Sequence, residues 1–160
     1  MSPTRCGFGA ANTSKRPISR LANRWHRTFC KEGMRVLIAD DQRSVGTSLA
    51  ELVRHCNHDI VAVVGSGVEA IQAYGQHHPD VVLMDYWMPK LNGATACRNI
   101  IAKHPGARVI LVSGWLPSNV MAGDAGAVAM LPKPVDLNAL ALTLDNVAHT
   151  LPSAEVTSGP

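Results

Sequence analysis

The sequence predicts an α/β fold: a doubly wound parallel sheet of five strands in the order 2-1-3-4-5, with helices on both faces. Short apolar segments alternate five times with segments whose apolar residues recur at helical spacing. The apolar segments are continuous and rich in β-branched residues, which is typical of strands buried on both faces of a parallel sheet. Right-handed crossover connections then favour the stated strand order.

Each predicted strand is short and is followed by a helical pattern. The strands are expected at 34–39, 60–64, 81–84, 108–112 and 127–131. The helices are expected at 44–55, 68–74, 94–104 and 137–147, with a short helix between Leu116 and Gly123. Pro79 ends the second helix, because proline disfavours helical geometry in the residue before it. This succession is the flavodoxin-like arrangement.

Length and composition favour one domain with an aliphatic core. The chain has 160 residues, of which 46% are hydrophobic and only 4% aromatic. We expect one folded domain over 34–150 and a disordered tail over 151–160. The four cysteines are scattered without a CxxC pair, so we expect reduced thiols. No apolar run suits a membrane span or a secretory signal, so we expect a cytoplasmic protein, monomeric or weakly dimeric.

The basic charge is concentrated in the first 33 residues. That head holds seven Lys/Arg and one acid, whereas residues 34–160 hold eight Lys/Arg and eleven acids. The sequence pI near 8.8 therefore gives no argument for DNA binding by the folded part. We expect no direct DNA binding. We expect the head to be disordered. Translation starting at Met34, an organelle transit peptide and a weak contact with an anionic surface are the alternatives.

Five polar residues stand at the ends of predicted strands. Asp40 and Asp41 follow the first strand and Asp85 follows the third, while Ser113 and Lys133 follow the fourth and fifth. Sites in such sheets form beyond the carboxyl ends of the strands, at the switch in strand order. The sequence therefore predicts that these five side chains meet at one rim.

The chemistry of this set favours phosphoryl transfer to a carboxylate. Converging carboxylates repel one another unless a cation is present, and oxygen ligands with access to water suit Mg²⁺. We expect Asp41 and Asp85 to bind the metal directly, Asp40 to bind it directly or through water, and the Trp87 carbonyl to complete the set. Asp85 is then the phosphoacceptor.

Each of these residues has an ordinary alternative when taken alone. Asp40 and Asp41 could cap the helix that follows them. Ser113 and Gly114 could form an ordinary turn, and Lys133 could be a solvated loop residue. The occurrence of all of them in this order favours the functional interpretation.

Residues 34 to about 148 resemble the receiver domain of two-component response regulators, of the single-domain chemotaxis-regulator type. The matching motifs are IADD at 38–41, VVLMDYWMPKLNG at 81–93, LVSG at 111–114 and AGAVAMLPKP at 125–134. The resemblance implies a magnesium site at Asp40, Asp41 and Asp85, and phosphorylation of Asp85 by a histidine kinase. It also makes Ser113 the switch residue and Lys133 the family lysine, with a Lys133–Pro134 bond that is often cis.

One residue and one segment depart from the family pattern. Met130 stands where the family usually has the Tyr or Phe of its switch, so we expect a less discrete switch. The segment from Ser113 to Lys133 is compressed and rich in glycine, so the helix expected within it is short or irregular.

Trp87 and Trp115 are expected close to the phosphoryl site. They would restrict water around an acyl phosphate or contact the kinase. The alternative is that both are simply exposed loop aromatics.

The predicted function is a phosphoacceptor in two-component signalling that is not an enzyme in its own right. Only about a dozen polar residues follow the last helix, so we expect no effector domain and an output through protein contact. The expected partners are a histidine kinase or histidine phosphotransfer protein and an output protein. The alternatives are a phosphorelay shuttle or a truncated DNA-binding regulator. A haloacid-dehalogenase-type phosphatase would need a DxD pair on the first strand, and a flavodoxin-like electron carrier would need a Ser/Thr/Gly-rich phosphate loop there.

Overall fold

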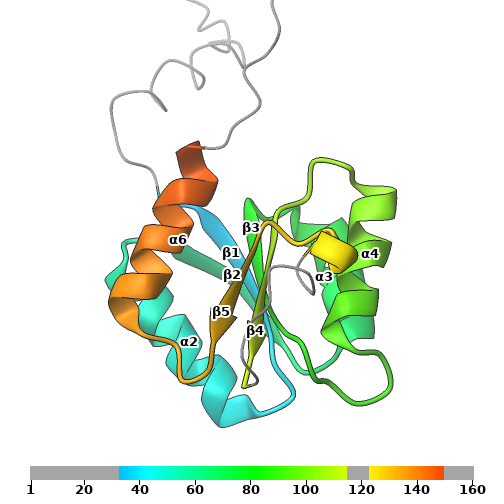
Figure 1. The fold of residues 1–160 in the computed structure, drawn as a ribbon, viewed down its shortest axis with the longest axis horizontal. Helices are drawn as coiled ribbons and strands as arrows, with labels where there is room; N and C mark the ends of the chain where they lie inside the picture. The colour runs from blue at the N-terminus through cyan, green and yellow to red at the C-terminus, as the bar shows by residue number, and fades with distance from the viewer. Residues whose placement is uncertain (1–32, 115–122, 150–160) are drawn as a thin grey trace, which may run out of the picture. The chain divides into compact units, whose positions relative to one another are not determined.

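A five-stranded parallel sheet forms the centre of the computed structural model, which describes residues 33–114 and 123–149 (Figure 1). The strand order is β2-β1-β3-β4-β5, which confirms the predicted fold class and order. The strands are β1 (Arg35–Ala39), β2 (Asp59–Val64), β3 (Val81–Asp85), β4 (Val109–Ser113) and β5 (Ala129–Pro132).

Four helices lie close to their predicted ranges. They are α2 (Arg43–His55), α3 (Gly67–His77), α4 (Gly93–Lys103) and α6 (Leu137–His149). The short helix expected between Leu116 and Gly123 lies outside the described residues except for Gly123. None of the helices in the described ranges has the length and apolarity needed to cross a membrane.

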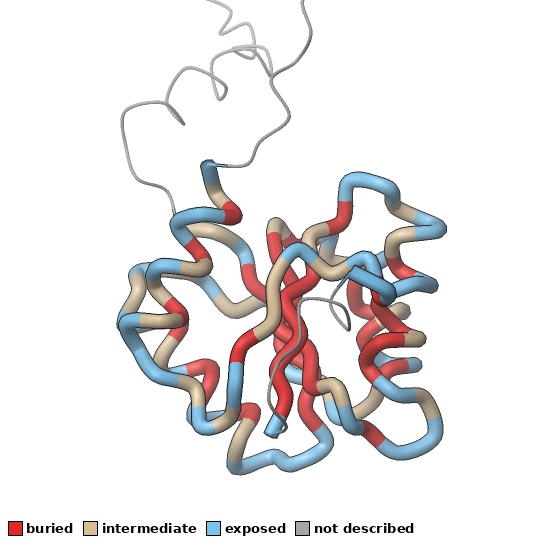
Figure 2. The backbone as a smooth tube through the Cα atoms, in the orientation of Figure 1, coloured by how far each residue is buried: buried red, intermediate tan, exposed pale blue. Residues whose placement is uncertain are grey.

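The helices form a layer on each side of the sheet. Figure 1 shows α2 and α6 on one face and α3 and α4 on the other. Along β1, Val36 and Ile38 pack into the α2/α6 core, whereas Leu37 and Ala39 pack into the α3/α4 core. Because side chains alternate along a strand, a strand covered on both faces is apolar throughout. Figure 2 shows this buried centre.

Local signals set the helix ends. The Ser66 side chain accepts a hydrogen bond from the Glu69 amide, and the Asn92 side chain accepts one from the Thr95 amide, so both act as N-caps. Helix α3 ends at His77, and His78 adopts a left-handed conformation before Pro79. The predicted role of Pro79 in ending this helix agrees with the observed boundary.

The register brings the carboxyl ends of the strands to one edge. Ala39 pairs with Met84 between β1 and β3, and Asp85 pairs with Val112 between β3 and β4. Ser113 pairs with Pro132 between β4 and β5. The residues that follow these strands therefore leave the sheet side by side.

Candidate functional site

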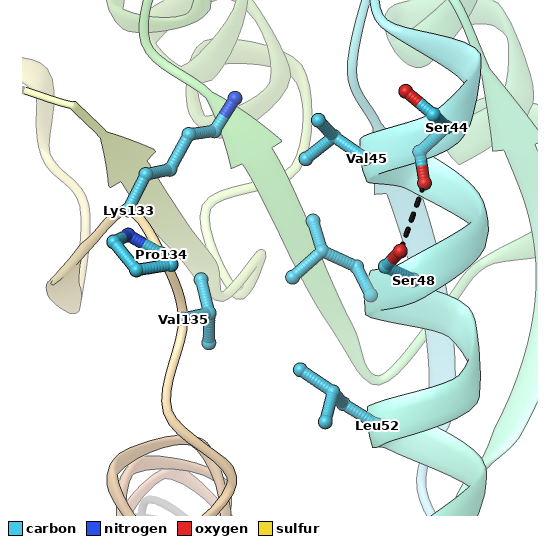
Figure 3. A pocket seen from close by; sticks show the side chains of 8 residues that line it. Ser44, Val45, Ser48, Leu52, Lys133, Pro134 and Val135 are labelled. Carbon is cyan, nitrogen blue, oxygen red and sulfur yellow. Dashed lines mark hydrogen bonds between the residues drawn. The ribbon is translucent and has the colours of Figure 1, made fainter.

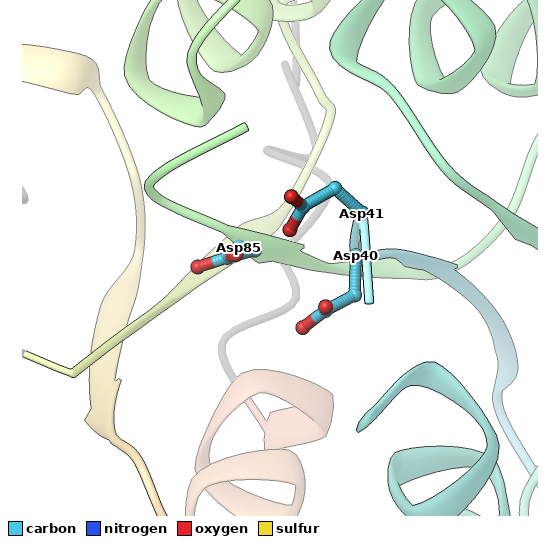
Figure 4. Close-up of side chains that lie close together, drawn as sticks. All are labelled: Asp40, Asp41 and Asp85. Carbon is cyan, nitrogen blue, oxygen red and sulfur yellow. The ribbon is translucent and has the colours of Figure 1, made fainter. Parts of the chain in front are cut away.

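Three carboxylates meet where β1 and β3 end. Asp40 and Asp41 follow β1, and Asp85 is the last residue of β3 (Figure 4). One carboxylate oxygen from each lies within 4.8 Å of the other two. Asp40 and Asp85 are buried, at 2% and 5% exposure, and Asp41 is exposed. The set thus combines buried negative charge with an opening to water.

Lys133 bridges the two buried carboxylates. Its Nζ lies 2.7 Å from Asp40 Oδ2 and 3.1 Å from Asp85 Oδ2. Its backbone amide donates to the Ser113 carbonyl over 2.7 Å, which fixes the end of β5 against the end of β4. The Lys133–Pro134 peptide bond is cis, as the family resemblance implied. All five predicted residues therefore lie at one rim.

The aspartates do not cap the first helix. The N-cap of α2 is Gln42, and its side chain makes no capping hydrogen bond. Asp40 Oδ1 instead accepts a hydrogen bond from the Gln42 amide over 2.9 Å, which orients the carboxylate within the cluster. The helix-cap interpretation of Asp40 and Asp41 is wrong.

Burial and charge act against each other in this cluster. Burial raises the pKa of Asp85, with the charge of Asp40 adding to the effect, while Lys133 and the Trp87 amide oppose it. Burial lowers the pKa of Lys133, but its hydrogen bonds to Asp40 and Asp85 outweigh burial and leave that pKa raised. The lysine therefore stays charged, and a further cation would relieve the remaining repulsion.

The loop of residues 86–92, between β3 and α4, is bonded tightly to Asp85 and its neighbours. The Trp87 amide donates to Asp85 Oδ1 over 3.3 Å, and the Gly93 amide donates to the Tyr86 carbonyl over 2.9 Å. A Cβ on Gly93 would overlap the Asp85 carbonyl oxygen, so this position requires glycine. From the sequence, Gly93 was assigned no role of its own beyond its place in the 81–93 motif. The position of Gly93 directly after a helix cap was the available signal for this close approach.

Trp87 belongs to this loop and follows Asp85 by two residues. Its side chain is 58% exposed, and its ring meets that of Tyr86 edge-on with centroids 5.3 Å apart. The Trp87 backbone lies at Asp85, because its amide donates to Asp85 Oδ1, and the shielding or contact role expected of its ring stays a prediction. Trp115 lies outside the described residues.

The carboxylates fit a small hard cation. Mg²⁺ binds oxygen ligands at about 2.0–2.1 Å in octahedral geometry, which places opposite ligands roughly 4.2 Å apart. The 4.8 Å spread of the three oxygens is close to this spacing, so small side-chain rotations bring them together. The donor set, all carboxylate and partly open to water, is the kind that Mg²⁺ prefers.

An apolar groove of about 550 Å³ adjoins the cluster between α2 and the segment after β5 (Figure 3). Lys133 lines it and also reaches the carboxylates, so one side chain borders both the groove and the acid cluster. The lining residues are Ser44, Val45, Ser48, Leu49, Leu52, Lys133, Pro134 and Val135. The groove was not predicted from the sequence, because its two walls come from segments about 90 residues apart along the chain. The only available signal was the apolar pair Pro134–Val135 directly after Lys133.

Met130 lies at the centre of β5. It pairs with Leu111 of β4 and is partly buried against the α3/α4 core. Its predicted role in a switch stays a prediction.

Known proteins are similar to this chain in sequence. Chemotaxis protein CheY of Listeria monocytogenes is 31% identical over 118 residues, which cover 72% of this chain and 98% of that protein. Transcriptional regulatory protein PdtaR of Mycobacterium tuberculosis is 36% identical over 108 residues, which cover 66% of this chain and 52% of that protein. The chain thus spans about half the length of this second relative.

Solved structures and family profiles agree with these relatives. The chain resembles a structure of the CheX–CheY–BeF₃–Mg²⁺ complex from Borrelia burgdorferi, with a TM-score of 0.68, 29% identity, and coverage of 72% of this chain and 89% of that one. The profile of the response regulator receiver domain matches residues 36–145. With the rim of acids and lysine already described, these matches mean that the chain belongs to the response regulator receiver domain family of two-component systems.

Proposed function

We propose that this receiver domain is a phosphoacceptor and that Asp85 takes up the phosphoryl group. The observation that supports this most strongly is the bridging of Asp40 and Asp85 by Lys133, beside a third carboxylate within 4.8 Å. This arrangement concentrates charge around one buried nucleophile at the end of a rigid strand. A structural ion pair alone would not require the third, exposed carboxylate.

The reaction we propose is a displacement at phosphorus. A carboxylate oxygen of Asp85 attacks a phosphohistidine donor, the new P–O bond forms as the P–N bond breaks, and the electron pair leaves with the donor imidazole. Lys133 Nζ, now 3.1 Å from Asp85 Oδ2, lies where it can stabilise the charge on the phosphoryl oxygens.

Asp40, Asp41, Asp85 and the Trp87 carbonyl are the proposed ligands of Mg²⁺. When bound, the ion supplies charge neutralisation for the carboxylates and for the phosphoryl oxygens. Asp40 has a second proposed role. It accepts a hydrogen bond from the Gln42 amide and one from Lys133 Nζ, and so holds the lysine in place beside the carboxylates.

The proposed output begins at Ser113 and Met130. Ser113 is buried at the end of β4, and its carbonyl is tied to the Lys133 amide. Movement of Lys133 and Ser113 toward a phosphoryl group would alter the β4–β5 edge, where Met130 is only partly buried. A ligand or modification shifts such an equilibrium only by its different affinity for the two states.

We further propose that the partner which donates the phosphoryl group contacts the groove between α2 and Pro134–Val135. The groove is apolar and adjoins Lys133, so a helix seated there would bring a histidine side chain towards Asp85. The donor is a histidine kinase or a histidine phosphotransfer protein, and the output protein binds elsewhere on the domain.

The proposed acceptor role is tested by labelling with acetyl phosphate. We expect wild-type protein with Mg²⁺ to take up one phosphoryl group, and we expect removal of the metal with a chelator to abolish uptake. Asp85→Asn should take up none, whereas Asp80→Asn, at the other end of β3, should be labelled normally. Equal labelling of Asp85→Asn and wild type would overturn the proposal.

A further inference from the structure

We propose that Gly67, the first residue of α3, is a positioning residue for the acceptor loop, residues 86–92, and through it for the metal site at Asp85. This inference rests on the proposed function, since it concerns the geometry of the same site. Gly67 is buried, and a Cβ placed on it would lie 2.7 Å from the Leu91 carbonyl oxygen and 3.1 Å from the Ala96 Cβ. Helix α3 therefore approaches the acceptor loop more closely than any other residue type would allow.

The Leu91 end of the loop has little freedom to move aside. The Leu91 amide donates to the Pro89 carbonyl over 2.9 Å, and the Leu91 side chain packs against the α3/α4 core. Lys90, between them, adopts φ 70°, a left-handed conformation that costs a lysine energy and persists where its surroundings enforce it. The Leu91 carbonyl is thus presented to Gly67 by a tight and fixed turn.

The other end of the loop is joined to the acceptor. The Gly93 amide donates to the Tyr86 carbonyl, and the Trp87 amide donates to Asp85 Oδ1. A displacement at Leu91 therefore passes through a short, internally bonded loop to the Trp87 backbone. The Trp87 carbonyl is the only proposed metal ligand that does not come from a carboxylate.

The size of the displacement can be estimated from the contact. Ordinary contacts of a Cβ begin at 3.4 Å, so an alanine at position 67 must separate α3 and Leu91 by about 0.7 Å. Gly67 does not have a positive φ, and alanine is the better helix former, so the substitution is unfavourable only through this contact. We expect Gly67→Ala to weaken Mg²⁺ binding about three- to tenfold.

A matched control lies on the same helix. A Cβ on Gly75 would meet no atom of the described residues within 4 Å, so Gly75→Ala should leave the loop unchanged.

The first measurement is amide hydrogen exchange without Mg²⁺. In Gly67→Ala, the amide hydrogens of Leu91 and Gly93 should exchange faster than in wild type. In Gly75→Ala, their exchange rates should match those of wild type. The second is a magnesium titration followed by NMR at the Trp87 and Gly93 amides.

The possible outcomes separate this inference from the proposed function. The inference alone is overturned if wild type binds Mg²⁺ and takes up label, and if a folded Gly67→Ala matches wild type in both amide exchange and Mg²⁺ affinity. Wild type that shows neither property overturns the proposed function and this inference with it. If Gly67→Ala does not fold, Leu91→Ala replaces it, because losing the Leu91 side chain frees the same turn. Unchanged exchange and Mg²⁺ affinity in that variant would contradict the inference.

Discussion

At the scale of single residues, the site holds charge that works against folding. Asp40 and Asp85 are buried next to each other, and one lysine is shared between them. Burial raises the pKa of Asp85, so its ionised form is less favourable in the folded than in the unfolded protein. Such costs are common where function requires a strained or charged arrangement.

Asp85→Asn should therefore stabilise the protein at neutral pH without Mg²⁺. A group whose pKa is raised by folding contributes stability at low pH, and that contribution is lost as the pH rises through the folded value. An asparagine at position 85 carries no charge, so it removes this loss of stability at neutral pH, while Lys133 keeps its contact with Asp40. We expect a gain of about 1 kcal/mol, or roughly 4 °C in Tm, by thermal unfolding.

The pH dependence provides the control for this prediction. The gain should shrink as the pH falls through the raised pKa of Asp85, because the wild-type carboxyl is then neutral. Glu51→Gln, which removes an exposed acid from α2, should change Tm little at any pH. A lower Tm for Asp85→Asn at neutral pH would show that its pairing with Lys133 outweighs the burial of its charge.

Trp87→Ala should shorten the lifetime of the acyl phosphate. The Trp87 amide donates to Asp85 Oδ1, so the side chain is attached next to the proposed acceptor, and we expect its ring to limit the approach of water to an acyl phosphate. We expect the half-life of phosphorylated protein to fall about two- to fivefold, with Mg²⁺ affinity unchanged. An unchanged half-life would rule out shielding and would leave the exposed ring as a contact for the partner.

At the scale of elements, α2 and the segment after β5 form a surface that neither makes alone. Their apolar residues face each other across the groove, and Lys133 joins that groove to the acid cluster. Helix α2 also begins directly after Asp40, Asp41 and Gln42, so a donor seated in the groove, as proposed, would approach Asp85 from the side of this helix.

Ser48→Arg should separate transfer by a protein donor from transfer by a small molecule. Ser48 is exposed on the groove wall, so an arginine there places a long charged side chain across the apolar surface. We expect phosphotransfer from the cognate phosphohistidine protein to slow at least tenfold, whereas labelling by acetyl phosphate stays at the wild-type rate. Thr47→Arg is the matched control, because Thr47 is exposed on the same helix but does not line the groove. Equal effects of the two variants would remove the groove from the proposed contact.

At the scale of the whole domain, the sheet separates the Arg108 hydrogen bonds at its amino-terminal edge from the acid cluster at its carboxyl-terminal edge. Arg108 precedes β4 at the amino-terminal edge of the sheet, where its Nε donates to the Asp80 carbonyl and its Nη1 to the Val147 carbonyl. It thus connects the start of β3, the start of β4 and the end of α6. No proposed site residue lies at that edge.

Arg108→Met should lower stability without altering the site. Hydrogen bonds from charged donors contribute about 1.5–3 kcal/mol each in favourable cases, and partial exposure reduces this. We expect a loss of about 2 kcal/mol in the free energy of unfolding by urea denaturation, with acetyl phosphate labelling unchanged well below Tm. Arg98→Met, on the exposed face of α4, should cost under about 0.5 kcal/mol. A loss of labelling in folded Arg108→Met would contradict this separation.

Much of the fold could be predicted because strand and helix periods are local properties of the chain. The rim residues followed from the same pattern, since parallel strands place their carboxyl ends at one edge. The start of β5 was predicted two residues early, because the run from Ala127 is apolar although Val128 is half exposed and the ladder begins at Ala129.

The features that were missed depend on approaches between distant segments. Gly67 and Gly93 matter because of backbone atoms that meet them in space, and glycine alone does not reveal which of its neighbours is close. The groove likewise needs α2 and Pro134–Val135 to be placed before it exists. Such features follow from packing and cannot be derived from the period of the sequence.

The most direct test of the central claim is chemical identification of the phosphorylated residue. Protein treated with acetyl phosphate and Mg²⁺ is reduced with borohydride, which converts an aspartyl phosphate to homoserine, and is then digested for peptide mass spectrometry. The proposed function predicts homoserine at position 85 and at no other aspartate. Homoserine at Asp40 or Asp41, or a stable phosphate on Ser113 with none at Asp85, would contradict it.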